Sequence, residues 1–306
     1  MAHRLKRLEA RTSSEMHRSG ALQREPASRR TSSLLHALEL PTCCENAALG
    51  RDPLEALLRR AIVRDELMLH FQPLVDARSR RIVQAEASLR WDSPDLGALS
   101  THSLIPLAEQ YELILPLTLW VLNEALSQCH GWQADEMQLG VSVNLSPACL
   151  EDPRFAQRIG VMLRSWELAP SRLTLELWPG DFPPDMTGAL RTLQQLRDMG
   201  VAIALDHFGR GASSLERLRQ LRVDRVKLDR SYIVEFTSHP QDRVIVEGLV
   251  AMAHQLGSLA VATDIPDAET ADALAAAGFD LLQGEALGEP LPAESFSQRW
   301  LSPQNG

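Results

Sequence analysis

The stretch that decides the fold reads Leu190-Arg-Thr-Leu-Gln-Gln-Leu-Arg-Asp-Met-Gly200-Val-Ala-Ile-Ala-Leu-Asp206. Its first half has an apolar residue at every third position, which predicts one buried face of a helix. Gly200 predicts the end of that helix, because glycine adopts the left-handed conformation found there without steric cost. The apolar run that follows is typical of a strand, and it ends at a carboxylate, Asp206.

This unit of helix, glycine and strand recurs from about Asp52 onward. Two further helical stretches end at Gly257 and Gly278, and an apolar run follows each. The strand-like runs are Leu67 to Val75, Ile82 to Trp91, Gln138 to Leu145, Leu173 to Leu177, Ala202 to Phe208, Arg225 to Leu228, Leu259 to Ala262 and Phe279 to Gln283. About eight strands in roughly 250 residues fit an α/β fold, the closed (β/α)8 TIM-like barrel. The alternative is an open doubly wound sheet, which the lack of a glycine-rich loop after the first strand disfavours.

Composition narrows the class of protein. The chain has 306 residues, 44% hydrophobic and 23% charged, which is ordinary for a globular protein and excludes a disordered, collagen-like or coiled-coil chain. No apolar run approaches the roughly 20 residues of a membrane span, and the best candidate, Leu113 to Leu122, predicts a buried helix. No secretory signal is visible, and the four cysteines have neither disulfide nor zinc spacing: Cys43, Cys44, Cys129 and Cys149. We therefore expect free thiols and a cytoplasmic location.

The chain divides near residue 50. Residues 1–50 hold 8 basic and 5 acidic residues and little apolar periodicity, which predicts a flexible, mildly basic tail. The tail is either plainly solvated or an arm that binds a partner or a membrane surface. Residues 51–306 form the folded domain. Because the whole chain carries a net charge of −9, this domain is acidic, which argues against a nucleic-acid polymer as partner.

Polar side chains follow several of the predicted strands. In a barrel these strand ends meet at one mouth, where chemistry takes place. The residues are Glu86, Asn144, Glu176, Asp206, Lys227, Asp229 and Gln283. Carboxylate and amide oxygens suit Mg²⁺ or Mn²⁺, so a metal-assisted hydrolase of a phosphorylated substrate is the first hypothesis. The alternative for any single residue is an interior polar group bonded to its neighbour, or a helix cap.

Ordered motifs along the chain resemble the EAL domain, the cyclic di-GMP phosphodiesterase family, over roughly residues 55–297. They are Phe71-Gln-Pro-Leu-Val-Asp76, Ala85-Glu-Ala-Ser-Leu-Arg-Trp91, Ile105-Pro-Leu-Ala-Glu109, Val143-Asn-Leu-Ser146, Leu175-Glu-Leu177, Asp206-His-Phe-Gly-Arg-Gly211, Ser213-Ser-Leu215, Lys227-Leu-Asp-Arg-Ser231, Gln283-Gly284 and Pro290-Leu-Pro292. The resemblance implies a barrel that binds cyclic di-GMP at its strand ends. It also implies two Mg²⁺ or Mn²⁺ ions that activate a water to cut one phosphodiester bond.

The resemblance assigns roles to individual residues. It implies first-ion ligands at Glu86, Asn144, Glu176 and Asp206, and a residual catalytic role for Lys227 in positioning the water. It implies nucleotide contacts at Gln72, Leu89, Arg90, Asp229, Gln283 and Pro290. Of these, Arg90 is suited to a bidentate contact with a phosphate.

Four positions depart from the family pattern: His207, Pro179, Thr263 and Pro266. His207 stands for the second of two paired aspartates, and the other three stand for glutamates. A neutral imidazole and a hydroxyl bring no negative charge to an ion that prefers oxygen, so the second ion should bind poorly. Losing it should lower the rate by on the order of 10³-fold or more. Asp264 could replace a lost ligand only if the strand slipped by one residue, which turns side chains to the other face.

The nucleotide site also departs from the family at the exit of the last strand. The aromatic residues that cover a guanine are absent, and Glu285 and Glu289 add negative charge unless they face solvent. Stacking on an aromatic ring contributes roughly 1–3 kcal/mol per base. We therefore expect binding weakened by roughly 10- to 1000-fold.

The sequence thus predicts a catalytically inactive EAL-domain signalling protein, acting as a cyclic di-GMP effector or a protein-interaction regulator. The alternative is an active phosphodiesterase that opens cyclic di-GMP to linear pGpG with Mg²⁺ or Mn²⁺. A third hypothesis is a scaffold that binds no nucleotide. We expect either a partial Mg²⁺ or Mn²⁺ site or no cofactor. The expected partners are cyclic di-GMP, a regulatory protein and a second copy of the chain, with no transmembrane segment.

Overall fold

The structure is a computed structural model. It describes residues 52–301 apart from residues 65, 135–138, 183–184, 210–213, 235 and 238, and apart from the side chains of residues 134 and 214. The predicted tail, residues 1–50, lies outside the described residues.

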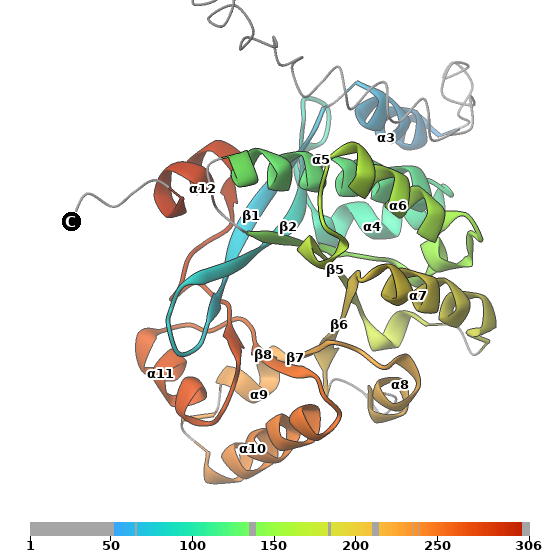
Figure 1. Cartoon of the computed structure of the whole chain (residues 1–306). Coiled ribbons are helices and arrows are strands. Elements are labelled where there is room, and N and C mark those ends of the chain that lie inside the picture. The colour runs from blue at the N-terminus through green and yellow to red at the C-terminus, as the bar shows by residue number, and fades with distance from the viewer. Residues whose placement is uncertain are drawn as a thin grey trace, which may run out of the picture.

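The described strands form one sheet that closes on itself, which confirms the predicted barrel (Figure 1). The ring runs β1–β9–β8–β7–β6–β5–β4–β2 and back to β1, while β3 and β10 pair outside it with β2 and β1. The strands are β1 (Leu67–Asp76), β2 (Ile82–Ser93), β3 (Gly97–Ser100), β4 (Gly140–Asn144), β5 (Leu173–Leu177), β6 (Ala202–Phe208), β7 (Arg225–Leu228), β8 (Leu259–Ala262), β9 (Leu281–Leu282) and β10 (Leu291–Pro292).

One ring strand runs against the others. β1 is antiparallel to both β2 and β9, whereas β2 and β4 to β9 are parallel neighbours. A tight turn after Asp76 joins β1 to β2. The Asp76 carboxylate accepts hydrogen bonds from Ser79 N at 2.7 Å and from Ser79 Oγ at 2.8 Å. A turn this short can join only antiparallel strands, because a parallel connection needs a crossover of a dozen or more residues. The barrel therefore differs from a strict βα repeat at its first unit.

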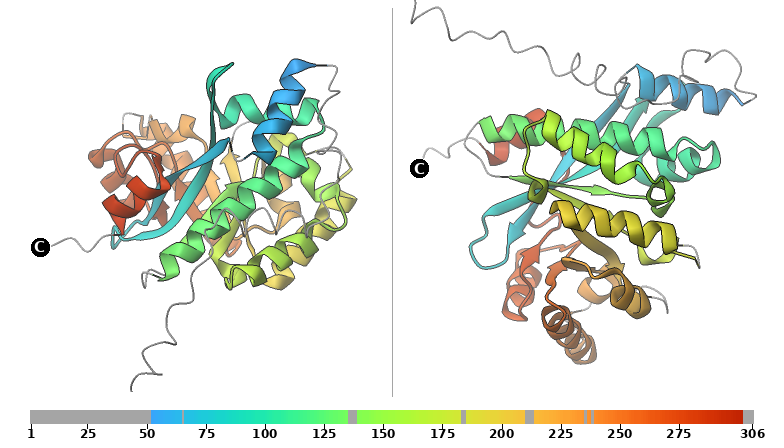
Figure 2. Two further views of the ribbon diagram at one scale, coloured as in Figure 1. Left: turned by 90° about the horizontal axis from the view of Figure 1, so that it is seen from above. Right: turned by 45° about the vertical axis from the view of Figure 1, so that its right-hand side comes forward.

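Helices cover the outside of the ring (Figure 2). The α-helices are α3 (Pro53–Val63), α4 (Thr101–Gln110), α5 (Ile114–Ala134), α6 (Phe155–Ser165), α7 (Thr187–Met199), α8 (Ser214–Leu221), α9 (Arg230–Val234), α10 (Pro240–Gln255), α11 (Ala268–Ala276) and α12 (Ala293–Trp300). Short 3-10 helices are η2 (Pro147–Glu151), η3 (Pro170–Arg172) and η4 (Pro179–Asp181). Among the described helices, none is both long and apolar enough to cross a bilayer.

The stretch that predicted the fold behaves as expected. α7 buries Ala189, Leu193 and Leu196 and ends at Gly200, whose φ of 95° lies in the left-handed region. The strand that follows, β6, has the predicted bounds, as have β5, β7 and β8. The predicted buried helix from Leu113 is α5, which begins at Ile114.

Candidate functional site

The mouth of the barrel gathers three carboxylates around one ammonium group. Lys227, in β7, places its Nζ 2.7 Å from Glu86 Oε2 and 2.5 Å from Glu176 Oε2. Asp206 Oδ2 lies 3.9 Å from the same nitrogen. These carboxylates come from β2, β5 and β6, so the ring closure brings together residues more than a hundred positions apart. The structure thus joins the predicted first-ion residues through a lysine.

Glu86 is fully engaged by N–H donors. Its Oε2 accepts from Lys227 and, at 3.0 Å, from Gln283 Nε2. Its Oε1 accepts from Asn144 Nδ2 at 3.2 Å. The amide of Asn144 therefore faces Glu86 with its nitrogen, and its oxygen is the atom left for other partners.

Burial and charge shift the pKa values of the cluster in different directions. Burial alone would raise the pKa of Glu86, but the Lys227 charge and the three donors outweigh it and lower that pKa. The pKa of Glu176 is raised to about 7 by burial and by the neighbouring Glu86 charge. Burial would lower the pKa of Lys227, but Asp206, Glu176 and Glu86 raise it well above its ordinary value. The three acids therefore favour the charged form of the lysine.

His207 lies beside the cluster at an irregularity of β6. The register between β6 and β7 shifts between Leu205 and Phe208, and His207 has a φ of 50°. A bulge of this kind turns consecutive side chains toward the same region. The His207 Nδ1 lies 3.2 Å from Asp229 Oδ2, and its Nε2 lies 3.7 Å from Asp206 Oδ2. The imidazole thus bridges the two acids that the sequence placed at neighbouring strand ends.

The other departures from the family pattern lie on the rim. Thr263 Oγ1 donates to the backbone oxygen of Leu228 at 3.0 Å. Asp264 is exposed and has a φ of 57°, in the left-handed region. Pro179 begins η4, where it supplies no side-chain donor or ligand atom. Pro266 supplies none either, so these positions add no anion to the mouth.

The donor set tests whether the ions implied by the resemblance fit. Glu86, Asn144, Glu176 and Asp206 offer oxygen ligands for one ion, and the ammonium of Lys227 lies within 4 Å of the three carboxylates. The second position has only an imidazole and a hydroxyl, both already bonded. Across residues 52–301 as described, no three His, Cys, Asp or Glu side chains gather in a geometry that would hold a metal ion. The residues present therefore do not fit a pair of divalent ions.

Three of the predicted nucleotide contacts lie on the hairpin of β1 and β2. Gln72 stands opposite Glu86 and donates from Nε2 to the backbone oxygen of Gly288 at 3.0 Å. Arg90 lies four residues beyond Glu86 on the same face of β2, and its Nη1 donates to the Leu89 backbone oxygen at 2.9 Å. Leu89 itself is buried on the opposite face.

The remaining predicted contacts, Asp229, Gln283 and Pro290, belong to other segments of the chain. Asp229 is bonded to His207 and to Ser231, and Gln283 is bonded to Glu86. Pro290 is half-buried next to β10, between the exposed Glu289 and the strand. Glu285 is exposed as well, so neither of these two glutamates is buried in the mouth.

Sequence reasoning missed a second polar pair inside the barrel. Arg225 donates from Nη1 to Gln84 Oε1, one layer below the lysine cluster. Gln84 precedes Glu86 by two residues, and Arg225 precedes Lys227 by two. Because side chains alternate along a strand, each pair shares the interior face. That spacing was the signal in the sequence that could have revealed this layer.

Trp178 was also missed. Its ring lies edge-on to His207 with the centroids 6.1 Å apart, and the residue is 38% exposed. It follows Glu176 by two positions, so it continues the interior face of β5 at the rim.

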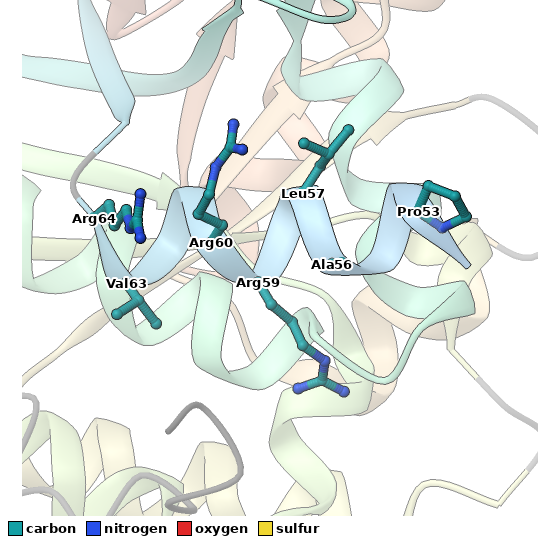
Figure 3. Close-up of a pocket in the computed structure, with 7 residues that line it drawn as sticks. All are labelled: Pro53, Ala56, Leu57, Arg59, Arg60, Val63 and Arg64. Carbon is teal, nitrogen blue, oxygen red and sulfur yellow. The ribbon is translucent and has the colours of Figure 1, made fainter. Parts of the chain in front are cut away.

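A hollow of about 590 Å³ lies along α3, away from these residues (Figure 3). It is lined by Pro53, Ala56, Leu57, Arg59, Arg60, Val63 and Arg64. Two of its arginines are already paired, Arg59 with Glu55 at 2.8 Å and Arg60 with Glu66 at 3.1 Å. The hollow therefore contributes nothing to the chemistry of the mouth.

Comparison with known proteins identifies relatives of this barrel. The chain is 35% identical over 240 residues to the bifunctional diguanylate cyclase/cyclic di-GMP phosphodiesterase MucR of Pseudomonas aeruginosa, which covers 78% of this chain and 35% of MucR. It is 30% identical over 247 residues to the cyclic di-GMP phosphodiesterase PdeR of Escherichia coli, covering 81% and 37%. The chain thus spans about a third of the length of these relatives.

Solved structures agree. The PaMucR phosphodiesterase in complex with c-di-GMP has a TM-score of 0.73 at 35% identity, covering 79% of this chain and 99% of that one. The EAL enzyme Bd1971 in its cAMP- and cyclic-di-GMP-bound form has a TM-score of 0.74 at 26% identity, covering 80% and 68%. The sequence model of the protein family described as the EAL domain matches residues 55–290 of this chain. With the barrel, the mouth residues and these relatives in agreement, the chain belongs to the EAL domain family.

Proposed function

We propose that this chain is a degenerate EAL domain that acts in cyclic di-GMP signalling as a nucleotide effector and protein-interaction regulator, without cleaving the nucleotide. The proposal rests on the two residues that stand where the family binds its second ion, His207 and Thr263. His207 is bonded to Asp229, and Thr263 to the Leu228 carbonyl. Neither group brings a negative charge to a divalent ion, so the second ion binds poorly. The attacking and leaving oxygens of the phosphodiester then lack the pair of ions that would stabilise both of them.

Cleavage is tested by incubating the full chain with cyclic di-GMP and Mg²⁺ or Mn²⁺, and following pGpG by chromatography. We expect a rate at least about 10³-fold below that of the EAL domain of MucR measured in parallel. The matched variant restores acids at both positions, His207→Asp with Thr263→Glu, and should gain activity. Turnover by the unaltered chain close to that of MucR would refute the proposal.

Nucleotide binding rests on the hairpin residues. Gln72, Leu89 and Arg90 keep the residue types that the family resemblance assigns to the nucleotide, and the PaMucR relative was solved with c-di-GMP. We propose that Arg90 turns from the Leu89 carbonyl to a phosphate of the ligand, where a guanidinium makes a bidentate contact.

Binding is measured by calorimetric titration of cyclic di-GMP into the full chain with Ca²⁺ present. We expect saturable binding that Arg90→Ala weakens by about 10-fold or more. The control is Arg243→Ala, because Arg243 lies on the outer helix α10, where it pairs with Glu247 and lies over the Phe236 ring. If the unaltered chain shows no heat of binding, the effector proposal is wrong, and the hypothesis of a scaffold that binds no nucleotide replaces it.

The output of the proposed effector is a protein contact, with either a regulatory protein or a second copy of the chain. A second copy is tested by light scattering of the eluting chain with and without cyclic di-GMP. A change of mass on adding nucleotide is expected if the copies pair, and an unchanged monomer mass points to a different protein.

The second candidate function is an active phosphodiesterase. It is favoured by the retention of Glu86, Asn144, Glu176, Asp206 and Lys227, and by relatives named as phosphodiesterases. The cleavage assay separates it from the effector.

A further inference from the structure

We propose that Trp178 is an aromatic platform at the barrel mouth, on which a guanine base of cyclic di-GMP stacks. This contact rests on the proposed function, since it says how the effector would hold one of the two bases of its ligand.

Trp178 differs in exposure from every other aromatic residue of the chain. The 6 tryptophans, 2 tyrosines and 7 phenylalanines all lie among the described residues, and Trp178 alone of them is exposed, at 38%. An exposed apolar side chain by itself is ordinary. The position of this ring therefore decides what it can do.

The backbone directs Trp178 into the mouth. Pro179 follows it, and a proline restricts the residue before it to extended backbone. Trp178 accordingly has a φ of −88° and a ψ of 125°. Because side chains alternate along an extended chain, Trp178 faces the same side as Glu176, two residues earlier. Its ring centroid lies 6.1 Å from that of His207, whose Nε2 lies 3.7 Å from Asp206 Oδ2.

The indole is held in position by its neighbours. A Cβ atom placed on Gly180 would lie 3.4 Å from Trp178 Cε2, so the ring lies in van der Waals contact with the chain of η4. The His207 ring stands at 68° to the indole. A ring that is already ordered loses less conformational entropy when a ligand binds to it.

The sheet register places Trp178 at the level of Arg90. The pairing of β2 with β4 and of β4 with β5 puts Glu176 at the level of Ser88. Trp178 and Arg90 each follow by two residues and share the interior face. Since β4 lies between β2 and β5, the two strands are about 10 Å apart. A cyclic dinucleotide with a phosphate on Arg90 therefore has a base within reach of Trp178.

Stacking also suits the charge of this mouth. Residues 283–290 include no aromatic side chain, and Glu285 and Glu289 are exposed there. Three carboxylates lie within 4 Å of the one ammonium of Lys227, which disfavours an anionic ligand. Stacking of a base on an aromatic ring needs no positive charge. Trp178 thus supplies an attraction that the segment after β9 lacks.

The test is a calorimetric titration of cyclic di-GMP into the full chain with Ca²⁺ present. Trp178→Ala should weaken binding by about 5- to 150-fold, the range that one stacked base contributes. Trp178→Phe keeps an aromatic face and should recover most of that loss. Leu256→Ala removes a 58% exposed apolar side chain at the end of α10, so it is the control and should bind as the unaltered chain does.

Salt separates stacking from a contact with phosphate. The loss caused by Trp178→Ala should stay the same between about 0.1 and about 0.5 M salt, whereas the loss caused by Arg90→Ala should shrink as salt screens the charges. The two losses should also add in the double variant, because the residues hold different parts of the ligand. A structural role for Trp178 would instead disturb the Arg90 contact and make the losses non-additive.

The outcomes distinguish this inference from the proposed function. If the unaltered chain binds and Trp178→Ala binds within about 2-fold of it, the ring holds no base and the effector proposal stands. If the unaltered chain shows no heat of binding, both are wrong.

A second measurement uses the unaltered chain and so does not depend on the folding of a variant. Trp178 is the one exposed tryptophan, so acrylamide should quench one part of the tryptophan emission readily. Saturating cyclic di-GMP should protect that part, because a stacked base covers the ring. Quenching that saturating nucleotide leaves unchanged would contradict the platform.

Discussion

Lys227 Nζ lies 2.5 Å from Glu176 Oε2, and these two side chains are 5% and 3% exposed. A buried ion pair is weak evidence for stability, since desolvation opposes the attraction. Removing one partner is a different matter, because the other charge stays buried without compensation. Here a single lysine faces three acids, so the fold should depend on it strongly.

Lys227→Met should therefore lower the free energy of unfolding by about 3–5 kcal/mol. Urea unfolding followed by tryptophan fluorescence measures the change. Arg219→Met, which breaks an exposed pair with Glu216 on α8, is the control and should change stability by about 0.5 kcal/mol or less. A loss below about 1 kcal/mol for Lys227→Met would show that the acids do not need the ammonium.

The interior pair Arg225 and Gln84 should act as one unit. Arg225→Met leaves the buried amide oxygen of Gln84 without a donor, which should cost about 1–3 kcal/mol. Gln84→Leu should cost a similar amount, while the double variant should cost less than the two together by about 1–2 kcal/mol. A double-mutant cycle by urea unfolding measures this. Strict additivity, as expected for Gln84→Leu combined with the distant, exposed Arg219→Met, would mean that the pair is not coupled.

Acid should weaken the attachment of α3. The pKa of Asp52 lies below its ordinary value because Tyr111 donates a hydrogen bond to its carboxylate, as does the Leu54 amide. The folded chain then holds the Asp52 proton less readily than the unfolded chain. This contribution is present above the ordinary pKa of 3.8 and is lost as the pH falls through the lowered pKa.

Tyr111→Phe should reduce that acid-dependent loss, measured as the urea midpoint at about pH 7 and about pH 3. Tyr232→Phe is the matched control, because the Tyr232 hydroxyl donates to the Gly209 carbonyl rather than to an acid. An equal acid response in the unaltered chain and in Tyr111→Phe would contradict the role of this bond.

The two described cysteines should be inert in the folded chain. Burial raises the pKa of the Cys129 thiol and of the Cys149 thiol to about 12. At about pH 8 their thiolate fraction is roughly 10³-fold below that of a free thiol. Mass spectrometry after iodoacetamide treatment should find both peptides unmodified in native buffer and modified in guanidinium. Rapid modification of either one in native buffer would contradict this burial.

Much of the barrel could be predicted because its strands are buried on both faces. Such strands appear as short apolar runs with a polar residue at the carboxyl end, and β5 to β8 have the predicted bounds. The direction of β1 could not be predicted this way, because an apolar run has the same pattern in either direction. The pairings of β3 and β10 were missed because strands of four and two residues carry too little periodicity.

For the site, the strand-end rule placed the acids, the amide and Lys227 at one mouth. It could not say which groups touch, because Lys227 meets Glu86 across 141 residues of sequence. The left-handed backbone of His207 is also invisible to such patterns, since the bulge that allows it depends on β7 as a neighbour. Whether the predicted residues bind nucleotide or metal stays a prediction.

The reversed direction of β1 has a mechanical consequence. Leu67, its first residue, pairs with Trp91 at the mouth end of β2, so the chain enters the ring beside the charged rim rather than at the opposite end. Gln72, the residue opposite Glu86, lies only five positions downstream. A force applied to the chain ahead of Leu67 is therefore transmitted along β1 to Gln72, the residue paired with Glu86, without first crossing the body of the barrel.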